Sequence, residues 1–344
     1  MNSPSCSPKN CHPASREKHD LPETTTLKEV KAYLLSNGTA RITGEEPEKN
    51  AESHAGPGAG KRGSVFFSDG CTRVRLSLDD KSPVEIKNFG KNAEMHVNGR
   101  TITGFLEPAA WHCPKQAYIT VSEGCIFGCR FCAVPKQDMR VKTAGEIEEM
   151  VGSVKDWIEC ISITSGVAES PEEDEEQIIE ILKRLDKFGL PIGVSIYPAP
   201  DTPARLHDAG VREVKFNLET ATDRLFREIC KGTDRDAIKK ALSESVRLFG
   251  KNRVFSNVIL GLGETDVEMK ECISGLCMEG VIPVIRPLTP SGELSGYRRP
   301  SEERIRQTSE FLKNELEKYG LDTTKAHTMC TKCTGCDLVP GRDL

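Results

Sequence analysis

Short apolar runs alternate with amphipathic segments between residues 115 and 320. Six runs rich in Val and Ile have the length of buried strands: 117–121, 160–164, 191–196, 214–217, 254–260 and 281–285. Segments between and after them carry apolar residues at helical spacing: 144–157, 172–188, 204–209, 236–249, 267–278 and 302–319. This alternation predicts a parallel sheet with right-handed crossovers. Barrels built in this way carry their chemistry on loops at the carboxyl ends of the strands.

The preceding residues follow the period of two that is typical of half-buried strands. Apolar and polar side chains alternate over residues 72–78, and a second strand begins at 84–86. Asn98-Gly99 is a strong hairpin signal between the short apolar stretches on either side. We predict a small antiparallel β unit over residues 61–114, which would cover the following domain or serve as a docking surface.

Residues 1–60 are rich in Ser, Pro, Lys, Glu and Gly, which predicts a mostly disordered linker. A short helix is expected around Leu27, Val30 and Leu34, with Thr26 and Glu29 as its capping box. Cys6 and Cys11 also lie in this region. They are either cluster ligands or, in the simpler interpretation, two solvated thiols.

Three cysteines follow the first predicted barrel strand within eight residues. Cys125, Cys129 and Cys132 are separated by three and two residues, and the next cysteine is Cys160. Each iron of a cubane cluster takes one ligand, so three cysteines leave one iron open. Structural zinc sites usually use four ligands in paired short spacings. The run therefore predicts a [4Fe-4S] cluster with one iron free for chemistry, and these cysteines are the candidate catalytic residues.

A second cysteine run lies in the C-terminal tail, residues 321–344. Cys330, Cys333 and Cys336 have the spacing that opens a bacterial ferredoxin run, but Pro340 stands where its fourth cysteine would be. His327 is a candidate fourth ligand, and three cysteines with one histidine also form structural zinc sites. We predict a second iron–sulfur cluster in this tail, with zinc as the alternative.

The first run, with Phe131 before its last cysteine, resembles the signature of the radical S-adenosylmethionine (SAM) enzymes. This resemblance implies a partial (β/α)6 TIM-like barrel over residues 115–320. It also implies that SAM chelates the open iron and is cleaved to a 5′-deoxyadenosyl radical, which abstracts hydrogen from the substrate. The SAM contacts that it implies are Phe131, Ser165, Gly166, Asn217, Glu219, Ile259 and Gly261.

The segment from Asn217 to Glu264 resembles biotin synthases, and lipoyl synthases share this core. Asn217 and Glu219 resemble the Asn-x-Asp motif that binds the SAM ribose, with Glu in place of Asp. The barrel cysteines of biotin synthases are missing, for example near Phe255. The resemblance implies sulfur insertion into an unactivated C–H bond, with the tail cluster as sulfur donor.

Two alternatives to sulfur insertion stay open. In one, the chain is a radical SAM enzyme of another type, such as peptide modification, methylation or rearrangement. Its tail cluster would then bind substrate or relay electrons. In the other, the chain is a non-catalytic iron–sulfur or zinc scaffold, which would have no use for ribose and adenine motifs. The resemblance to radical SAM enzymes implies an electron donor of the ferredoxin or flavodoxin type. A likeness to archaeal two-protein lipoyl synthases would add an acylated carrier protein or a second radical SAM protein.

Composition narrows the setting in which this chemistry would occur. A formal net charge of −5 provides no basic footprint for nucleic acid. No run of apolar residues is long enough to span a membrane, and no apolar N-terminal segment predicts secretion. Fourteen cysteines without a secretion signal favour metal chemistry in a reducing cytoplasm. Because oxygen damages an exposed cluster, we expect an anaerobic setting.

Overall fold

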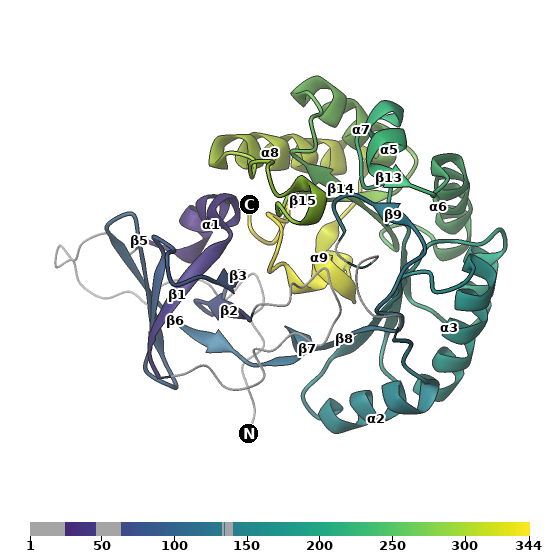
Figure 1. Ribbon diagram of the computed structural model, residues 1–344, viewed down its shortest axis with the longest axis horizontal. Coiled ribbons are helices and arrows are strands. Elements are labelled where there is room, and N and C mark those ends of the chain that lie inside the picture. Colours follow the sequence, from purple (N-terminus) through teal and green to yellow (C-terminus); the bar gives the residue numbers. More distant parts are fainter. Residues whose placement is uncertain (1–24, 46–62, 133, 135–139) are drawn as a thin grey trace.

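The computed structural model describes residues 25–45, 63–132, 134 and 140–344. Cys6, Cys11 and most of the predicted linker lie outside these ranges. The described chain forms a small closed β-barrel and a larger open barrel of strands and helices, which lie side by side (Figure 1). The C-terminal tail lies between them. Over the described ranges, no helix is long and apolar enough to cross a membrane.

The larger body is the predicted partial barrel. Its seven-stranded sheet has the order β15-β14-β12-β11-β10-β8-β7. The strands are β7 Ala109–Pro114, β8 Gln116–Thr120, β10 Cys160–Thr164, β11 Ile192–Ser195, β12 Glu213–Lys215, β14 Val254–Leu260 and β15 Ile282–Pro287. The strands from β8 to β15 are parallel and coincide with the six predicted runs, whereas β7 pairs antiparallel with β8 at the edge. The mixed α/β partial barrel is therefore confirmed.

Helices cover the outside of this curved sheet (Figure 1). They are α2 Ala144–Val154, α3 Pro171–Leu185, α4 Thr202–Asp208, α5 Asp223–Ile229, α6 Arg235–Phe249, α7 Asp266–Met278 and α8 Glu302–Tyr319, with short 3-10 turns at Asp186–Phe188 and Gly292–Leu294. Thr143 and Thr265 start α2 and α7 with capping boxes, which satisfy amide groups that a helix end leaves free. The sequence pattern missed α5, because seven residues are too few to show a helical period.

The smaller body begins with α1 Leu27–Asn37, the helix expected in this region. Its cap differs from the prediction, because the Thr26 hydroxyl donates to the Glu29 side chain and accepts no backbone hydrogen bond. The strands after it are β1 Thr39–Gly44, β2 Ser64–Ser68, β3 Arg73–Leu78, β4 Glu85–Asn88, β5 Ala93–Val97 and β6 Arg100–Glu107. They close into a barrel in the order β1-β3-β2-β6-β5-β4.

One expectation for this region is corrected by β1, because residues 39–44 are expected to be linker. The ladders among β2, β3, β4, β5 and β6 are antiparallel. By contrast, β1 runs parallel to both β3 and β4 and closes the barrel between them. Ala40 is fully buried in this arrangement. Both ladders join segments distant in sequence, so the local pattern of a short polar strand could not predict them.

The tail returns to the partial barrel instead of extending away from it. It contains a 3-10 turn at Thr323–Lys325 and the helix α9 Met329–Cys333. In Figure 1, α9 lies within the curve of the sheet. The Met329 amide donates to the Gln116 side chain at the start of β8, 2.6 Å away. A Cβ on Gly193 of β11 would lie 2.1 Å from the Thr328 hydroxyl, so this close approach requires glycine.

Candidate functional site

The cysteine loop follows β8 at the carboxyl end of the sheet. Cys125, Cys129 and Cys132 are half-buried, and their thiols lie close enough for Cys125 and Cys129 to influence the pKa of Cys132. Burial raises the pKa of Cys132 to about 12 and also raises that of Cys125. Backbone amides of Phe127 and Val167 donate to the Cys125 thiol and oppose this shift. A bound metal cluster would supply the positive charge that these thiolates need.

A second segment braces the cysteine loop from the side. The two-residue strand β9, Gly128–Cys129, pairs antiparallel with β13, Cys230–Lys231. The Arg130 amide donates to the Ile229 carbonyl at 2.9 Å. The Phe127 ring packs edge-on against Tyr197, with 4.7 Å between their centroids. The conformation of the loop is therefore set by residues far along the chain.

Cys230 lies directly beside Cys129. The ladder places the two residues opposite each other, and a hydrogen bond from Cys230 to the Cys129 thiol raises the pKa of Cys230. Cys230 is 4% exposed and packs as a small apolar side chain does. No signal near Cys230 in the sequence indicates its neighbour, because the contact depends on the antiparallel pairing.

Ser165 and Gly166 follow β10 and contact the start of the cysteine loop, Ser165 through its hydroxyl and Gly166 through its backbone. The Gly166 amide donates to the Ser122 carbonyl, while the Ser122 amide donates to the Ser165 hydroxyl at 3.2 Å. A Cβ on Gly166 would lie 2.2 Å from the Gly124 carbonyl oxygen and 3.1 Å from the Cys125 Cβ. Only glycine allows this approach.

We expect Gly166→Ala to impair cluster binding, because the added methyl group must displace the backbone at Gly124. The iron bound after anaerobic reconstitution should fall by about two or more irons per chain, which is at least half of one [4Fe-4S] cluster. The matched control is Gly152→Ala in α2, where the new Cβ would meet only a Phe188 ring atom at 3.9 Å. The control should keep its iron. Full iron content in Gly166→Ala would show that cluster binding does not require glycine at this contact.

Four of the expected SAM contacts meet beside the loop at the ends of β12 and β14. The Ile259 amide donates to the Glu219 carbonyl at 2.8 Å, and the Asn257 amide donates to the Asn217 side chain at 3.2 Å. Glu219 has a positive φ of 61°, which turns the chain after β12. Gly261 follows at the end of β14, also with a positive φ, of 108°.

The Glu219 carboxyl group has an unusual environment. Burial raises its pKa to about 7, although Lys215, Arg286 and a hydrogen bond with Asn217 each oppose the rise. It is also close enough to Cys132 to raise the pKa of that thiol. Glu219 therefore lies between the cysteine loop and the barrel interior, and its charge changes near neutral pH.

Glu264 explains the shape of the glycine-containing turn after β14. Its carboxylate is buried and accepts hydrogen bonds from the amides of Gly261 and Leu262 at 2.7 and 2.8 Å. Arg304 of α8 pairs with it at 3.0 Å. Glu264 thus orders the turn that carries Gly261. Phe131, the remaining expected contact, is half-buried in the cysteine loop, where its carbonyl accepts from the Ser291 hydroxyl at 3.3 Å.

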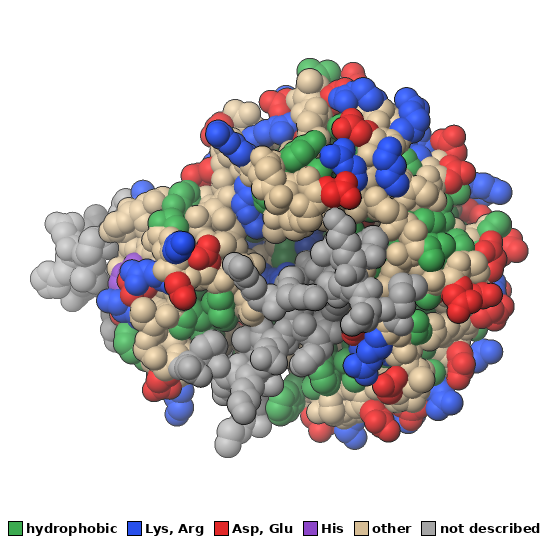
Figure 2. Space-filling view, in the orientation of Figure 1, with side chains coloured by type: hydrophobic (Ala, Val, Ile, Leu, Met, Phe, Trp, Pro, Cys, Tyr) green, Lys and Arg blue, Asp and Glu red, His purple; other side chains and the backbone are tan. Residues whose placement is uncertain are grey.

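The tail cysteines face the barrel interior from the opposite side. Arg286 of β15 and Lys215 of β12 donate to the Cys330 thiol at 3.0 and 3.5 Å. Burial raises the pKa of the neighbouring Tyr118 to about 12. Lys215 and Arg286 also lower the pKa of the Glu219 carboxyl group through their charge. Figure 2 shows Lys or Arg side chains in the hollow at the centre of the face that is turned toward the viewer.

His327, the candidate fourth ligand from the sequence, lies beside Glu213 at the start of β12. Its amide donates to the Glu213 carboxylate at 2.8 Å. The pKa of the His327 imidazole is lowered by burial and by the positive charges of Arg253, Arg212 and Lys332, whereas the charge of Glu213 raises it. The residue that the structure places against the tail cysteines is Cys113 of β7, which the sequence left without a role.

Across the described residues, no three His, Cys, Asp or Glu side chains form a group that could hold a metal ion. In a cubane cluster each thiolate binds a different iron, whereas tetrahedral zinc draws four sulfurs to within about 3.8 Å of one another.

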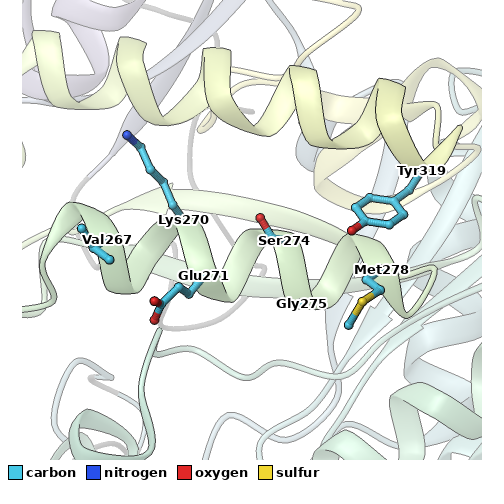
Figure 3. A pocket seen from close by; sticks show the side chains of 7 residues that line it. All are labelled: Val267, Lys270, Glu271, Ser274, Gly275, Met278 and Tyr319. Carbon is cyan, nitrogen blue, oxygen red and sulfur yellow. The ribbon is translucent and has the colours of Figure 1, made fainter.

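A shallow groove lies on the outer surface between α7 and α8, lined in part by exposed Val267 and Met278 (Figure 3). It belongs to the helical layer, away from both cysteine runs.

Comparisons with known proteins bear on the family of the partial barrel. The family model described as Radical SAM superfamily matches residues 119–274, from β8 into α7. The chain is 27% identical over 279 residues to a probable dual-specificity RNA methyltransferase of Symbiobacterium thermophilum, covering 76% of the chain and 73% of that protein. It is 25% identical over 237 residues to a putative methylthiotransferase of Methanocaldococcus jannaschii, covering 61% of the chain. The chain spans only 51%, about half, of the length of that relative.

The fold is also found among solved structures. The crystal structure of methylornithine synthase matches with a TM-score of 0.50 and 20% identity, over 58% of this chain and 62% of that one. This likeness concerns the fold alone. Together with the family model, it supports the radical SAM superfamily for the partial barrel, and this family implies a [4Fe-4S] cluster and SAM.

Proposed function

We propose that this radical SAM enzyme holds its [4Fe-4S] cluster through Cys125, Cys129 and Cys132 and cleaves SAM reductively to attack a substrate inside the barrel. One observation carries the proposal. Residues from separate strand ends converge on the cysteine loop, with Gly166 against Cys125 and Glu219 near Cys132. Such convergence at the carboxyl ends of parallel strands is where barrel enzymes build active sites.

The chain's own groups have distinct tasks in this proposal. The three thiolates hold the cluster, which when bound supplies the electron that cleaves SAM to a 5′-deoxyadenosyl radical. Asn217 and Glu219 offer an amide and a carboxylate to the ribose hydroxyls. Ile259 and the Gly261 turn, ordered by Glu264, offer an apolar surface and backbone groups to adenine. The Ser165–Gly166 backbone and the half-buried Phe131 complete the contacts proposed for SAM.

The net reaction has two candidates. Sulfur insertion into an unactivated C–H bond, as in biotin and lipoyl synthases, is supported by a second group of thiols that faces the same interior through Cys330. A methylthiotransferase among the relatives is consistent with sulfur chemistry. The alternative is another radical reaction, such as methylation, peptide modification or rearrangement. Its tail cluster would bind substrate or relay electrons, and the methyltransferase relative is consistent with this.

Either reaction needs partners that deliver electrons and substrate. We propose a reductant of the ferredoxin or flavodoxin type, because reductive cleavage of SAM consumes one electron. Cysteine loop residue Ile126 is 52% exposed, which gives such a donor an apolar contact near the cluster. For sulfur insertion, an acylated carrier protein or a second radical SAM protein would be the further partner.

The test is anaerobic reconstitution with iron and sulfide, followed by incubation with dithionite and SAM. The expected product is 5′-deoxyadenosine, formed even without substrate in an abortive reaction. Absence of this product from protein that carries a full [4Fe-4S] cluster would overturn the proposal. Addition of candidate substrates should increase product formation, and a gain of sulfur mass in the substrate would select sulfur insertion over the alternative.

A further inference from the structure

Cys113 lies against the tail although the two are far apart in sequence. It is the fifth residue of β7, the strand that leads from the small barrel into the partial barrel. Cys113 and Cys333 are 4% and 5% exposed and pack together with Phe66 and Ala109 in a small buried cluster. A hydrogen bond joins the two thiols.

All three tail cysteines are near Cys113. In addition to Cys333, the thiols of Cys330 and Cys336 are close enough to raise the pKa of Cys113 through their charge. Cys330 and Cys333 lie in α9, and Cys336 follows three residues beyond Cys333. Thr334, with a φ of 60°, turns the chain between Cys333 and Cys336.

The small barrel fixes the tail in this position. Arg73 of β3 donates to the Cys333 carbonyl at 3.0 Å, and the Arg75 amide donates to the Gly335 carbonyl at 2.8 Å. A Cβ on Gly335 would lie 2.6 Å from the Phe66 ring, so only glycine allows the tail to pack here. Lys31 of α1 is fully buried, donates to the Thr334 carbonyl at 2.6 Å and pairs with Asp343 at 2.7 Å.

The charges around the four thiols suit an anionic metal centre. Arg286 and Lys215 donate to the Cys330 thiol at 3.0 and 3.5 Å. Four thiolates on a cubane leave a net negative charge, and in a buried site such a charge requires nearby cations. Asp337 pairs with Arg286 at 3.0 Å and thereby orients the guanidinium group that reaches Cys330.

We propose that Cys113, Cys330, Cys333 and Cys336 together hold a second iron–sulfur cluster, a cubane with one thiolate on each iron. Cys113 takes the place that Pro340 leaves empty in the ferredoxin-like run. The small barrel thereby gains a function, because β7 supplies one ligand and β3 holds the loop that carries the others. The assignment itself is independent of SAM cleavage.

This ligand set bears on the two candidate reactions. A cubane with four thiolates has no open iron, so a substrate cannot bind to it without displacing a cysteine. Sulfide can leave it only if the cluster is taken apart. In sulfur insertion the four-thiolate cluster would therefore be consumed, whereas a cluster that relays electrons would persist through the reaction.

The test uses the full chain with Cys125, Cys129 and Cys132 all replaced by alanine, so that only the second site remains. After anaerobic reconstitution, this variant should bind about four irons and four sulfides. Adding Cys113→Ala leaves one iron without its thiolate and should therefore change the Mössbauer spectrum. Cys277→Ala, a buried cysteine in α7, is the matched control and should leave the spectrum unchanged.

Cys113→Ser keeps the assignment testable if the alanine variant does not fold, since serine is nearly isosteric and its oxygen can replace sulfur on iron. It should yield a folded protein whose cluster has an altered spectrum. Retention of four irons with an unchanged spectrum in either Cys113 variant would overturn the assignment, as would one zinc and no iron in the triple-alanine background. Four irons in that background, together with no SAM cleavage by the wild type, would refute only the proposed function.

Discussion

Cys129→Ala should abolish formation of 5′-deoxyadenosine from SAM, whereas Cys333→Ala should leave most of it. Cys129 lies at the centre of the loop that Gly166 and β13 hold in place, and the loss of one of three thiolates leaves two irons without a protein ligand. In the Cys129→Ala variant, total iron should fall from about eight to about four per chain. Iron analysis and chromatography of the product after anaerobic reconstitution would measure both effects.

Cys71→Ala serves as the cysteine control for this pair. Cys71 is exposed in the turn between β2 and β3, so its variant should keep about eight irons and full SAM cleavage. The two cysteine runs have separate roles in the proposed mechanism. If Cys333→Ala abolished cleavage as completely as Cys129→Ala, that separation would be wrong.

Glu213→Gln should detach the tail from the partial barrel and lower the free energy of unfolding by about 3–5 kcal/mol. Glu213 is fully buried at the start of β12, and its carboxylate accepts from the amides of His327 and Thr328 at 2.8 Å. It also accepts from the Thr328 hydroxyl and pairs with Arg253 at 2.9 Å. A glutamine amide would turn an NH2 group toward some of these donors and leave the others with a weaker acceptor.

Glu159→Gln is the matched control, because Glu159 also binds the tail through Lys332, at 3.0 Å, but its side chain is 48% exposed. An exposed ion pair of this kind contributes about 0–1 kcal/mol. Denaturant unfolding gives the free energies, and limited proteolysis reports whether the tail is released. Equal effects of the two substitutions would show that the buried carboxylate is not what anchors the tail.

The partial barrel was predictable because its signals are local. Each parallel strand is buried on both faces and appears as a short run of apolar residues, and each longer helix shows its period within a few turns. The loop with Cys125, Cys129 and Cys132 was equally visible, since its three ligands lie within eight residues. The family comparison supports the predicted partial barrel.

The contacts that build the sites were not visible in the same way. Cys230 meets Cys129 only because a two-residue strand pairs antiparallel with the cysteine loop. His327 was the nearest candidate in sequence for the tail site, yet it lies beside Glu213, while the distant Cys113 lies against Cys333. Proximity in sequence does not indicate these neighbours, because the tail folds back across the sheet.

The small barrel illustrates the same limit. Its hairpin at Asn98-Gly99 is a local signal, and β5 and β6 pair on either side of it. Its closure depends on β1, a short polar strand whose two parallel partners lie elsewhere in the chain. Such a strand has no distinctive pattern of its own.

Residue order alone was sufficient for the elements of the barrel and for a cysteine run that leaves one iron open. These features depend on side chains a few positions apart, whose spacing controls periodicity and ligand geometry. The second group of thiols is different. Gln116 and Met329 are 213 positions apart, and their hydrogen bond helps to hold α9 inside the sheet. Cys113 reaches the tail cysteines only through such long-range contacts, which no local pattern encodes.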